Sequence, residues 1–166
     1  MPELQPNSRH CFACGLENLY GLQLRFYETG PNEVTAQYTV PEHFQGYPGV
    51  VHGGVVTAML DEVTGRAHIR GDPPRFMYTA KLEVRFRKNV PIGVPLRVVG
   101  RAEGSKSRRA TSIGMIYDPD GELLAEAKAL LIDLPEGAVE NVELEALGWK
   151  VYEEENSISP GSVGEL

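Results

Sequence analysis

The sequence predicts an α+β fold in which an antiparallel β-sheet is wrapped around one long central helix. Two segments with strand-like alternation come first, one segment with helical spacing follows, and four more strand-like segments complete the pattern. Short turns separate the last four segments, which implies antiparallel neighbours. A chain of 166 residues, 42% of them hydrophobic, has room for one such domain with a sizeable core.

The first two predicted strands form a hairpin. Apolar and polar residues alternate over residues 22–28 and again over residues 34–40, and residues 30–32 supply a short turn between them. Residues 41–49 contain two prolines and two glycines, which predicts an irregular loop.

Residues 53–70 have the spacing of a helix with one buried face. Gly71 and Asp72 are followed by two prolines, which cannot continue a helix, so we expect the helix to end near Arg70. The apolar residues recur at three- and four-residue steps: Val55, Val56, Met59, Leu60, Val63 and Ala67.

Four further strands are predicted over residues 76–88, 96–103, 109–117 and 123–134. In the first of them apolar residues alternate with charged ones, so we expect one face against the core and one face in solvent. The apolar members are Ala80, Leu82, Val84 and Phe86.

The excess negative charge lies at the C-terminal end. The net charge is −7, and residues 135–166 contain eight acids and one base, so they account for all of it. This shift predicts a domain over residues 1–134 and an acidic tail over residues 135–166. Apolar side chains predict that the tail docks as far as about residue 152, and we expect its end to be disordered.

Composition argues against several classes of partner. The negative net charge disfavours nucleic acid, because phosphate binding needs a cationic face. The longest apolar runs have four or five residues, far below the ~20 that cross a bilayer, and the first residues lack a secretory signal. We therefore expect a cytoplasmic protein without a nucleic-acid or membrane partner.

Cys11 and Cys14 form a Cys-x-x-Cys pair with three possible roles. A structural zinc site needs four ligands, no second cysteine pair exists, and His10 or His43 would complete a site only with unusual geometry. A redox pair of this type stands before a helix, whereas a strand is predicted to follow here. We therefore expect reduced thiols in a buried turn, no metal site and no cofactor.

The strongest chemical motif lies at the start of the predicted helix, where Gly53 and Gly54 follow His52. Glycines at this position leave the first N–H groups open to a ligand, and the positive end of the helix dipole favours an oxygen that becomes negative. Such an arrangement is typical of an oxyanion hole. The alternative is that the glycines only let the loop meet the helix without a clash.

Asp61 is the candidate acid of this helix, because aspartate is a mediocre helix former and lies here among apolar residues. Alternatively it faces solvent beside a surface ion pair of Glu62 and Arg66. Gly53 and Asp61 are eight residues apart, about 12 Å along one helix, so they cannot contact the same carbonyl. A shared site would need two copies of the chain related by a twofold axis.

Together, His52, Gly53, Gly54 and Asp61 resemble the motif of the hotdog-fold acyl-CoA thioesterases, in particular the phenylacetate-pathway-like (PaaI-like) branch. The resemblance covers roughly residues 11–134. It implies a hotdog fold and a homodimer with sites at its seam, often paired into a tetramer. It also implies that the Gly53 N–H polarises the thioester carbonyl of an acyl-CoA. Asp61 of the partner subunit would then act as general base or as nucleophile.

The resemblance implies several helper residues. Thr79 lies eighteen residues after the acid, where some relatives have an assisting hydroxyl, and strand alternation predicts it on the polar face, opposite Leu82. Gln45 is the candidate for an amide that orients water, although its spacing differs from that of the family. His52 and Gly54 are assigned to substrate binding.

Coenzyme A carries phosphates, so the basic turn formed by Lys106, Arg108 and Arg109 is a candidate contact, although solvated sheet faces have the same composition. The alternative function is a hotdog protein that binds acyl-CoA without turnover, as a sensor or carrier. Asp61 favours the enzyme, because a carboxylate that faces a thioester is costly unless it is used. Hydratase chemistry on the same fold would need a His–acid pair that we do not find.

Overall fold

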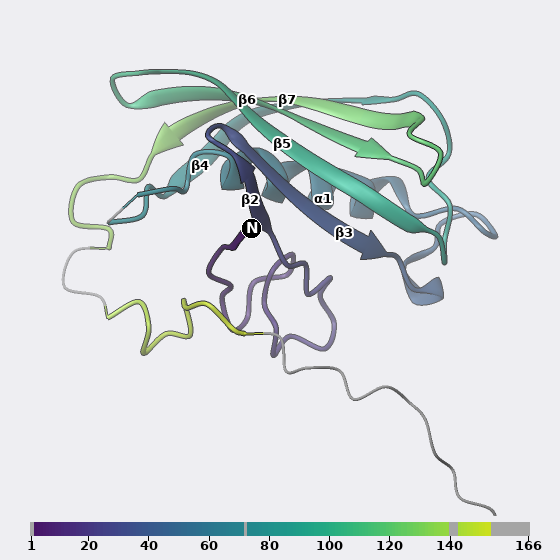
Figure 1. Cartoon of the computed structure of the whole chain (residues 1–166), viewed down its shortest axis with the longest axis horizontal. Coiled ribbons are helices and arrows are strands. Elements are labelled where there is room, and N and C mark those ends of the chain that lie inside the picture. The colour runs from purple at the N-terminus through teal and green to yellow at the C-terminus, as the bar shows by residue number, and fades with distance from the viewer. Residues whose placement is uncertain (1, 72, 140–142, 154–166) are drawn as a thin grey trace, which may run out of the picture.

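The fold is given by a computed structural model that describes residues 2–71, 73–139 and 143–153 (Figure 1). Its elements in chain order are β1 (Glu3–Leu4), β2 (Tyr27–Gly30), β3 (Glu33–Thr39), the 3-10 helix η1 (Glu42–Phe44), α1 (Gly53–Arg66), β4 (Met77–Phe86), β5 (Pro95–Lys106), β6 (Arg109–Tyr117) and β7 (Leu123–Asp133).

The strands form one antiparallel sheet in the order β1-β2-β3-β5-β6-β7-β4. The helix α1 lies along one face of this sheet, as Figure 1 shows, and contacts β3 to β7. The predicted α+β fold, with an antiparallel sheet around one long helix, is therefore confirmed. The buried face of α1 contains four of the predicted residues, Val56, Met59, Leu60 and Val63.

Two glycines let α1 approach the sheet closely. Gly100 of β5 and Gly114 of β6 are paired in register beneath the helix. A Cβ atom on Gly100 would lie 2.2 Å from the carbonyl oxygen of Val63, and one on Gly114 would lie 3.0 Å from Cγ2 of Thr64. Any larger residue at position 100 would therefore push the helix away from the sheet.

The first predicted strand is wrong over its first five residues. Leu22, Leu24 and Phe26 are buried, as their alternation predicts, but β2 begins only at Tyr27. Gln23 has a φ of 55°, which an extended strand does not accommodate. The N–H groups of Leu22 and Leu24 instead donate to carbonyl oxygens in the preceding cysteine turn. This segment thus covers the core without joining the sheet.

The helix α1 ends at Arg66, four residues before the predicted end. Beyond it, the N–H of His68 donates to Gly65 in a turn, and the His68 ring lies 2.9 Å from the carbonyl oxygen of Thr111 on β6. This contact draws the chain towards the sheet and away from the helix axis. The remaining predicted strands agree with the observed bounds to within three residues.

Residues 143–153 pack against the N-terminal segment and α1. The Trp149 ring contacts Phe76 edge-on, with 5.1 Å between ring centres, and the Arg66 guanidinium lies 4.9 Å from the centre of the Trp149 ring. Asn7 and Lys150 exchange two backbone hydrogen bonds. The end of the tail, predicted to be disordered, falls outside the described residues, and the domain limit at residue 134 stays a prediction.

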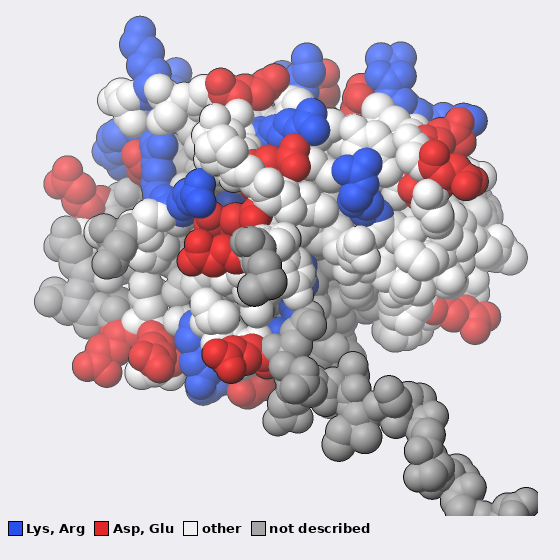
Figure 2. All heavy atoms as spheres, in the orientation of Figure 1, with Lys and Arg blue, Asp and Glu red and all other residues white. Residues whose placement is uncertain are grey.

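Basic and acidic side chains are intermixed on the face shown in Figure 2. The longest helix in the described part of the chain, α1, has 14 residues. Among the described residues, no helix combines the length and apolar character needed to span a bilayer.

Candidate active site

One N–H group is open at the start of α1. His52 caps the helix: its Nδ1 accepts a hydrogen bond of 2.9 Å from the Gly54 N–H. The carbonyl oxygen of His52 accepts from Val55 and Val56. The exposed Gly53 N–H has no acceptor among the described residues. The predicted oxyanion donor is thus available, whereas the Gly54 N–H already donates to the His52 ring; the assignment of Gly54 to substrate binding stays a prediction.

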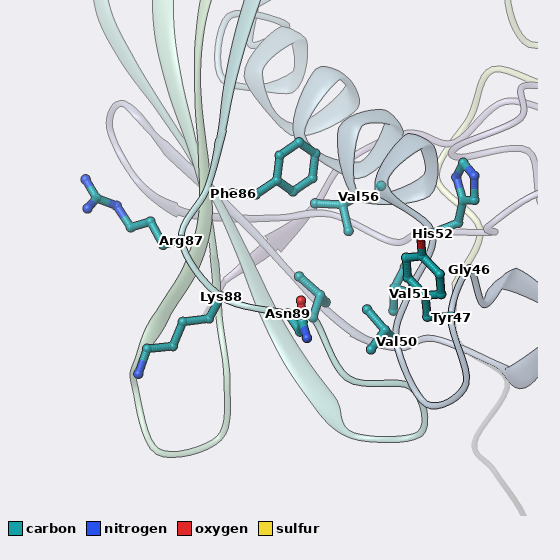
Figure 3. A pocket seen from close by; sticks show the side chains of 12 residues that line it. Gly46, Tyr47, Val50, Val51, His52, Val56, Phe86, Arg87, Lys88 and Asn89 are labelled. Atoms are coloured by element: carbon teal, nitrogen blue, oxygen red, sulfur yellow. The ribbon is translucent and has the colours of Figure 1, made fainter.

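A cavity of about 590 Å³ lies beside this open N–H group (Figure 3). Val56 of α1 and Phe86 of β4 approach each other across it, and Tyr47 stands at its rim. The backbones of Arg87 and Lys88 contribute to its wall, but their side chains point away from it in Figure 3. Val50, Val51, Val56 and Phe86 therefore supply the apolar part of its lining, beside the polar His52 and Asn89.

Asp61 and Thr79 are joined directly. The Thr79 hydroxyl donates a hydrogen bond of 2.7 Å to Oδ1 of Asp61. Asp61 also lies in the regular part of α1, where its carbonyl oxygen accepts from the Thr64 hydroxyl at 2.8 Å. The carboxylate predicted to be catalytic is thus held by the residue predicted to assist it, within one copy of the chain.

The predicted polar-face position of Thr79 is wrong. The pairing of β4 with β7 contains a β-bulge between Thr79 and Lys81. These two residues lie two positions apart on β4, but their partners, Leu131 and Leu130, are adjacent on β7. Thr79 therefore stands opposite the buried Leu131 and shares a sheet face with Leu82, which packs against the core. The bulge turns the hydroxyl towards α1 and Asp61.

Asp61 and Thr79 line a second cavity of about 260 Å³, together with Cys11, Cys14 and Glu62. Gly53 does not line this cavity, and Asp61 does not line the first one. The two predicted catalytic groups of one chain therefore face separate spaces, in agreement with the separation of about 12 Å expected along the helix.

The other predicted site residues lie outside both cavities. Gln45 follows η1, and its Oε1 accepts from the Gly49 N–H at 3.4 Å. Lys106, Arg108 and Arg109 are exposed at the turn between β5 and β6. The structure of one chain therefore does not bring these four side chains to Gly53 or to Asp61.

Sequence reasoning missed a buried polar cluster beside Asp61. The predicted pair of Glu62 and Arg66 exists, with 2.8 Å between Oε1 and Nε, but it is not on the surface, because Arg66 is only 2% exposed. The Arg66 guanidinium lies over the Phe26 ring and over the Trp149 ring, 4.9 Å from each centre. Burial raises the pKa of Glu62 to about 7, although Arg66 acts in the opposite direction. The i,i+4 spacing predicts the pair, but its burial depends on residues far away in the sequence.

Residues 48–125 match the family model described as the thioesterase superfamily. The Xenopus laevis protein named acyl-coenzyme A thioesterase THEM4 is 27% identical over 112 residues, which are 66% of this chain and 49% of that protein. The chain spans about half the length of the curated relatives that it matches.

Solved structures of the superfamily have the same fold. One thioesterase superfamily protein has a TM-score of 0.70 and 30% identity, and the match covers 75% of this chain and 61% of that one. The PaaI protein of the E. coli phenylacetic acid degradation operon has a TM-score of 0.62 over 69% of this chain and 81% of its own. Its 11% identity supports a common fold alone. The predicted resemblance to hotdog-fold thioesterases is confirmed.

Proposed function

We propose that this protein hydrolyses the thioester bond of an acyl- or aryl-coenzyme A. One observation carries the proposal: α1 has an open N–H donor at Gly53 and, eight residues later, a carboxylate on Asp61 that is held by a hydroxyl. An oxyanion donor and a positioned carboxylate are the two groups that hydrolysis of a thioester requires. The thioesterase superfamily region and the name of the THEM4 relatives support the same reaction.

The two groups act in one site when two copies of the chain meet around a twofold axis. Support comes from β4, which ends the sheet and has no partner strand on its outer side among the described residues. Tyr78 and Phe86 of this strand are 61% and 54% exposed. An open edge with large apolar side chains is suited to association with a second copy. The minimum assembly is a homodimer, and a dimer of dimers would keep the same paired sites.

The reaction follows from these positions. The thioester carbonyl oxygen accepts a hydrogen bond from the Gly53 N–H of one copy, and the positive end of α1 stabilises the negative charge that develops on it. Asp61 of the other copy either removes a proton from the attacking water or attacks the carbonyl carbon itself. In the second route water hydrolyses the resulting anhydride. Coenzyme A leaves as the thiolate and takes up a proton in both routes.

The remaining site residues have supporting roles. Thr79 orients the carboxylate of Asp61 through its hydroxyl group. The cavity beside Gly53 accommodates part of the acyl-CoA. His52 shapes the helix start. We keep Gln45 as a candidate for orienting water, and the basic turn, Lys106, Arg108 and Arg109, as a candidate contact for the phosphates.

The first test is release of free thiol from short, medium, long and aryl acyl-CoAs by the wild-type chain and by Asp61→Asn. We expect at least one substrate to be hydrolysed and the variant to lose about 100-fold or more in kcat/KM. Measurable binding of acyl-CoAs without turnover of any of them would refute hydrolysis and favour the sensor or carrier.

A matched pair of variants tests the oxyanion donor. Gly53→Pro removes the N–H group at the first helical position, where proline is well tolerated. Gly53→Ala keeps the N–H group, and its Cβ would meet only the Phe86 ring, at 3.6 Å. We expect Gly53→Pro to lose about 100-fold or more in kcat and Gly53→Ala to stay close to wild type. Equal activity of the two variants would exclude the Gly53 N–H as the donor.

A further inference from the structure

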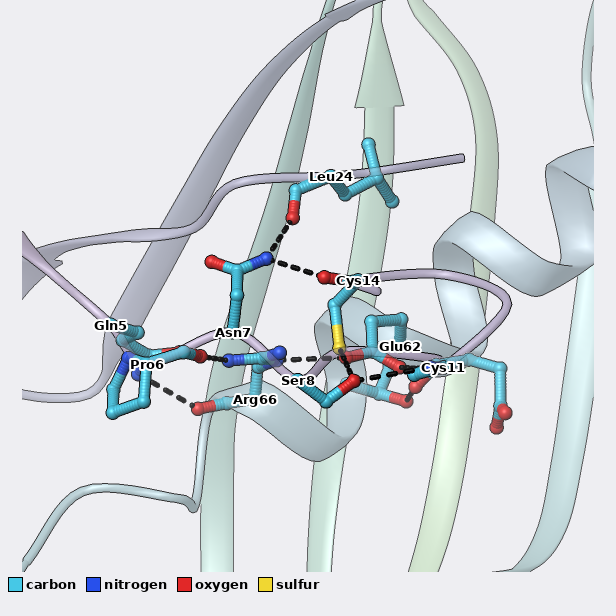
Figure 4. A network of polar contacts seen from close by, with 11 residues as sticks. Gln5, Pro6, Asn7, Ser8, Cys11, Cys14, Leu24, Glu62 and Arg66 are labelled. Atoms are coloured by element: carbon cyan, nitrogen blue, oxygen red, sulfur yellow. Dashed lines mark hydrogen bonds and ion pairs between the residues drawn. The ribbon is translucent and has the colours of Figure 1, made fainter. Parts of the chain in front are cut away.

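Three groups with metal-binding chemistry face one another beside the candidate active site (Figure 4). Cys11 and Cys14 come from the N-terminal turn, and Glu62 comes from α1, 51 positions after Cys11. The two sulfur atoms and a carboxylate oxygen all lie within 4.8 Å of one another. The distance between Cys11 Sγ and Glu62 Oε2 is 3.9 Å. The fold thus adds a third ligand to a pair that is isolated in the sequence.

The cysteine turn is built to hold its sulfur atoms in place. The Gly15 N–H donates to the carbonyl oxygen of Cys11 at 2.8 Å, and a Cβ on Gly15 would lie 2.4 Å from that oxygen. Only glycine fits there. The Ser8 hydroxyl accepts a hydrogen bond of 3.2 Å from the Cys11 N–H and lies 3.5 Å from the Cys14 sulfur atom. These contacts fix the positions of both cysteines, which bind metals as thiolates.

Arg66 orients the carboxylate of Glu62. Its Nε binds Oε1 of Glu62 at 2.8 Å, which leaves Oε2 directed at Cys11. Outer groups of this kind commonly orient the ligands of a metal ion. Two thiolates, one carboxylate and a divalent cation sum to one negative charge, which the buried Arg66 guanidinium would neutralise. The ligand set therefore suits its surroundings electrostatically.

We propose that Cys11, Cys14 and Glu62 bind one zinc ion, with a fourth position open to the 260 Å³ cavity that also contains Asp61 and Thr79. In a tetrahedral zinc site with Zn–S near 2.3 Å and Zn–O near 2.0–2.2 Å, ligand atoms lie about 3.5–3.8 Å apart. To reach these distances, the two sulfur atoms and the Glu62 oxygen would have to move closer to one another by about 1 Å or less. Thiolate ligands favour zinc over magnesium or calcium.

The sequence predicts no metal site because it offers no second cysteine pair and no well-placed histidine as further ligands. Glu62 was assigned to a surface ion pair, so it was not counted as a ligand, and the open position needs only a water molecule. Zinc binding releases the thiol protons and ties the N-terminal turn to α1 next to Asp61. The ion then stabilises the fold in addition to any effect on hydrolysis.

The test uses the reduced, metal-free full chain, with Zn²⁺ and Co²⁺ as probes. We expect one equivalent of zinc to remain bound after desalting, a cobalt–thiolate charge-transfer band, and protection of the Cys11 thiol from alkylation by zinc. Cys14→Ser and Glu62→Gln should each lower zinc affinity at least about tenfold. The matched control, Glu17→Gln, alters an exposed acid next to the same turn and should leave the affinity unchanged.

The protection measurement needs no variant, so it stays decisive if a substitution disturbs the fold. A Cys11 thiol that stays as reactive in excess zinc as in the metal-free chain overturns the proposal. Zinc retention by the Cys11→Ser/Cys14→Ser double variant equal to that of wild type also overturns it. The proposal is also overturned if the chain forms a Cys11–Cys14 disulfide and takes up no zinc after that disulfide is reduced.

Discussion

The hydroxyl of Thr79 reaches Asp61 because a bulge in β4 reverses the alternation of the strand at Ala80. Without the bulge the same side chain would point away from α1, as simple alternation predicts. The hydrogen bond between Thr79 and Asp61 thus depends on one extra residue in β4. The hydrogen bond limits the carboxylate to one orientation, which leaves Oδ2 available for the reaction.

Thr79→Val keeps the shape of the side chain and removes the hydroxyl. We expect kcat to fall roughly tenfold with little change in KM, since the lost hydrogen bond positions a charged group and does not bind substrate. Thr79→Ser retains a hydroxyl and should recover most of the activity. Steady-state kinetics with the best acyl-CoA substrate would measure both, and wild-type kcat in Thr79→Val would contradict the positioning role.

The two thiols of the metal-free, reduced chain should differ sharply in reactivity. The pKa of Cys11 is lowered to about 6, and that of Cys14 is raised to about 12 by its hydrogen bond to Cys11 and by burial. Because the thiolate is the reactive form, alkylation of Cys11 should rise as the pH passes through about 6 and then level off. Cys14 should stay protected. Mass spectrometry of chains alkylated between about pH 5 and pH 9 checks this, and equal labelling of the two cysteines would contradict it.

At the scale of elements, the close packing of α1 against β5 and β6 fixes the positions of the helix side chains. Gly100 and Gly114 form a shallow depression under Val63, so the helix backbone contacts the sheet directly. Any shift of the helix would also shift Gly53 and Asp61, because one rigid helix carries both. Packing in the core and geometry in the site are therefore coupled.

Gly100→Ala should lower the free energy of unfolding by about 1–3 kcal/mol or more, because the new methyl group would meet the backbone oxygen of Val63 at 2.2 Å. Gly104→Ala, in the same strand, would meet only Oγ1 of Thr111 at 3.6 Å and should change stability by about 0.5 kcal/mol or less. Urea unfolding of both variants measures the difference. Equal stability of the two would show that the helix can move without cost.

At the scale of the whole molecule, one chain holds two separate halves of the proposed site. Gly53 faces the 590 Å³ cavity, and Asp61 faces the 260 Å³ cavity. A second copy docked near β4 would supply the missing half to each. The exposed aromatic side chains of this edge strand support such an interface.

Mixing Asp61→Asn chains with Gly53→Pro chains tests the shared site. Each variant alone should be inactive, but a mixed dimer contains one site with an intact Gly53 from one copy and an intact Asp61 from the other. With random exchange of subunits we expect about a quarter of wild-type activity to return. Subunit exchange is checked by native mass spectrometry. Exchange without recovery of activity would mean that each site is built within one chain.

Local sequence patterns predicted the helix, its buried face and most strands, because hydrophobic periodicity is a property of neighbouring residues. The same patterns failed at Gln23, where a positive φ ends the extended segment, and at Ala80, where a bulge reverses the alternation. Neither irregularity has a marker in a single sequence. The engagement of the Gly54 N–H by the His52 ring was equally hidden, since it depends on a side-chain conformation.

By itself, the sequence determined the α+β fold, the motif at the start of α1 and the spacing that separates Gly53 from Asp61. These features depend on residues near one another along the chain, where helix geometry and propensity act. Only the tertiary structure decided that Thr79 contacts Asp61, that Arg66 is buried and that Glu62 faces the two cysteines. Those contacts join segments as far apart in the sequence as Arg66 and Trp149, and long-range packing, which no local pattern encodes, brings them together.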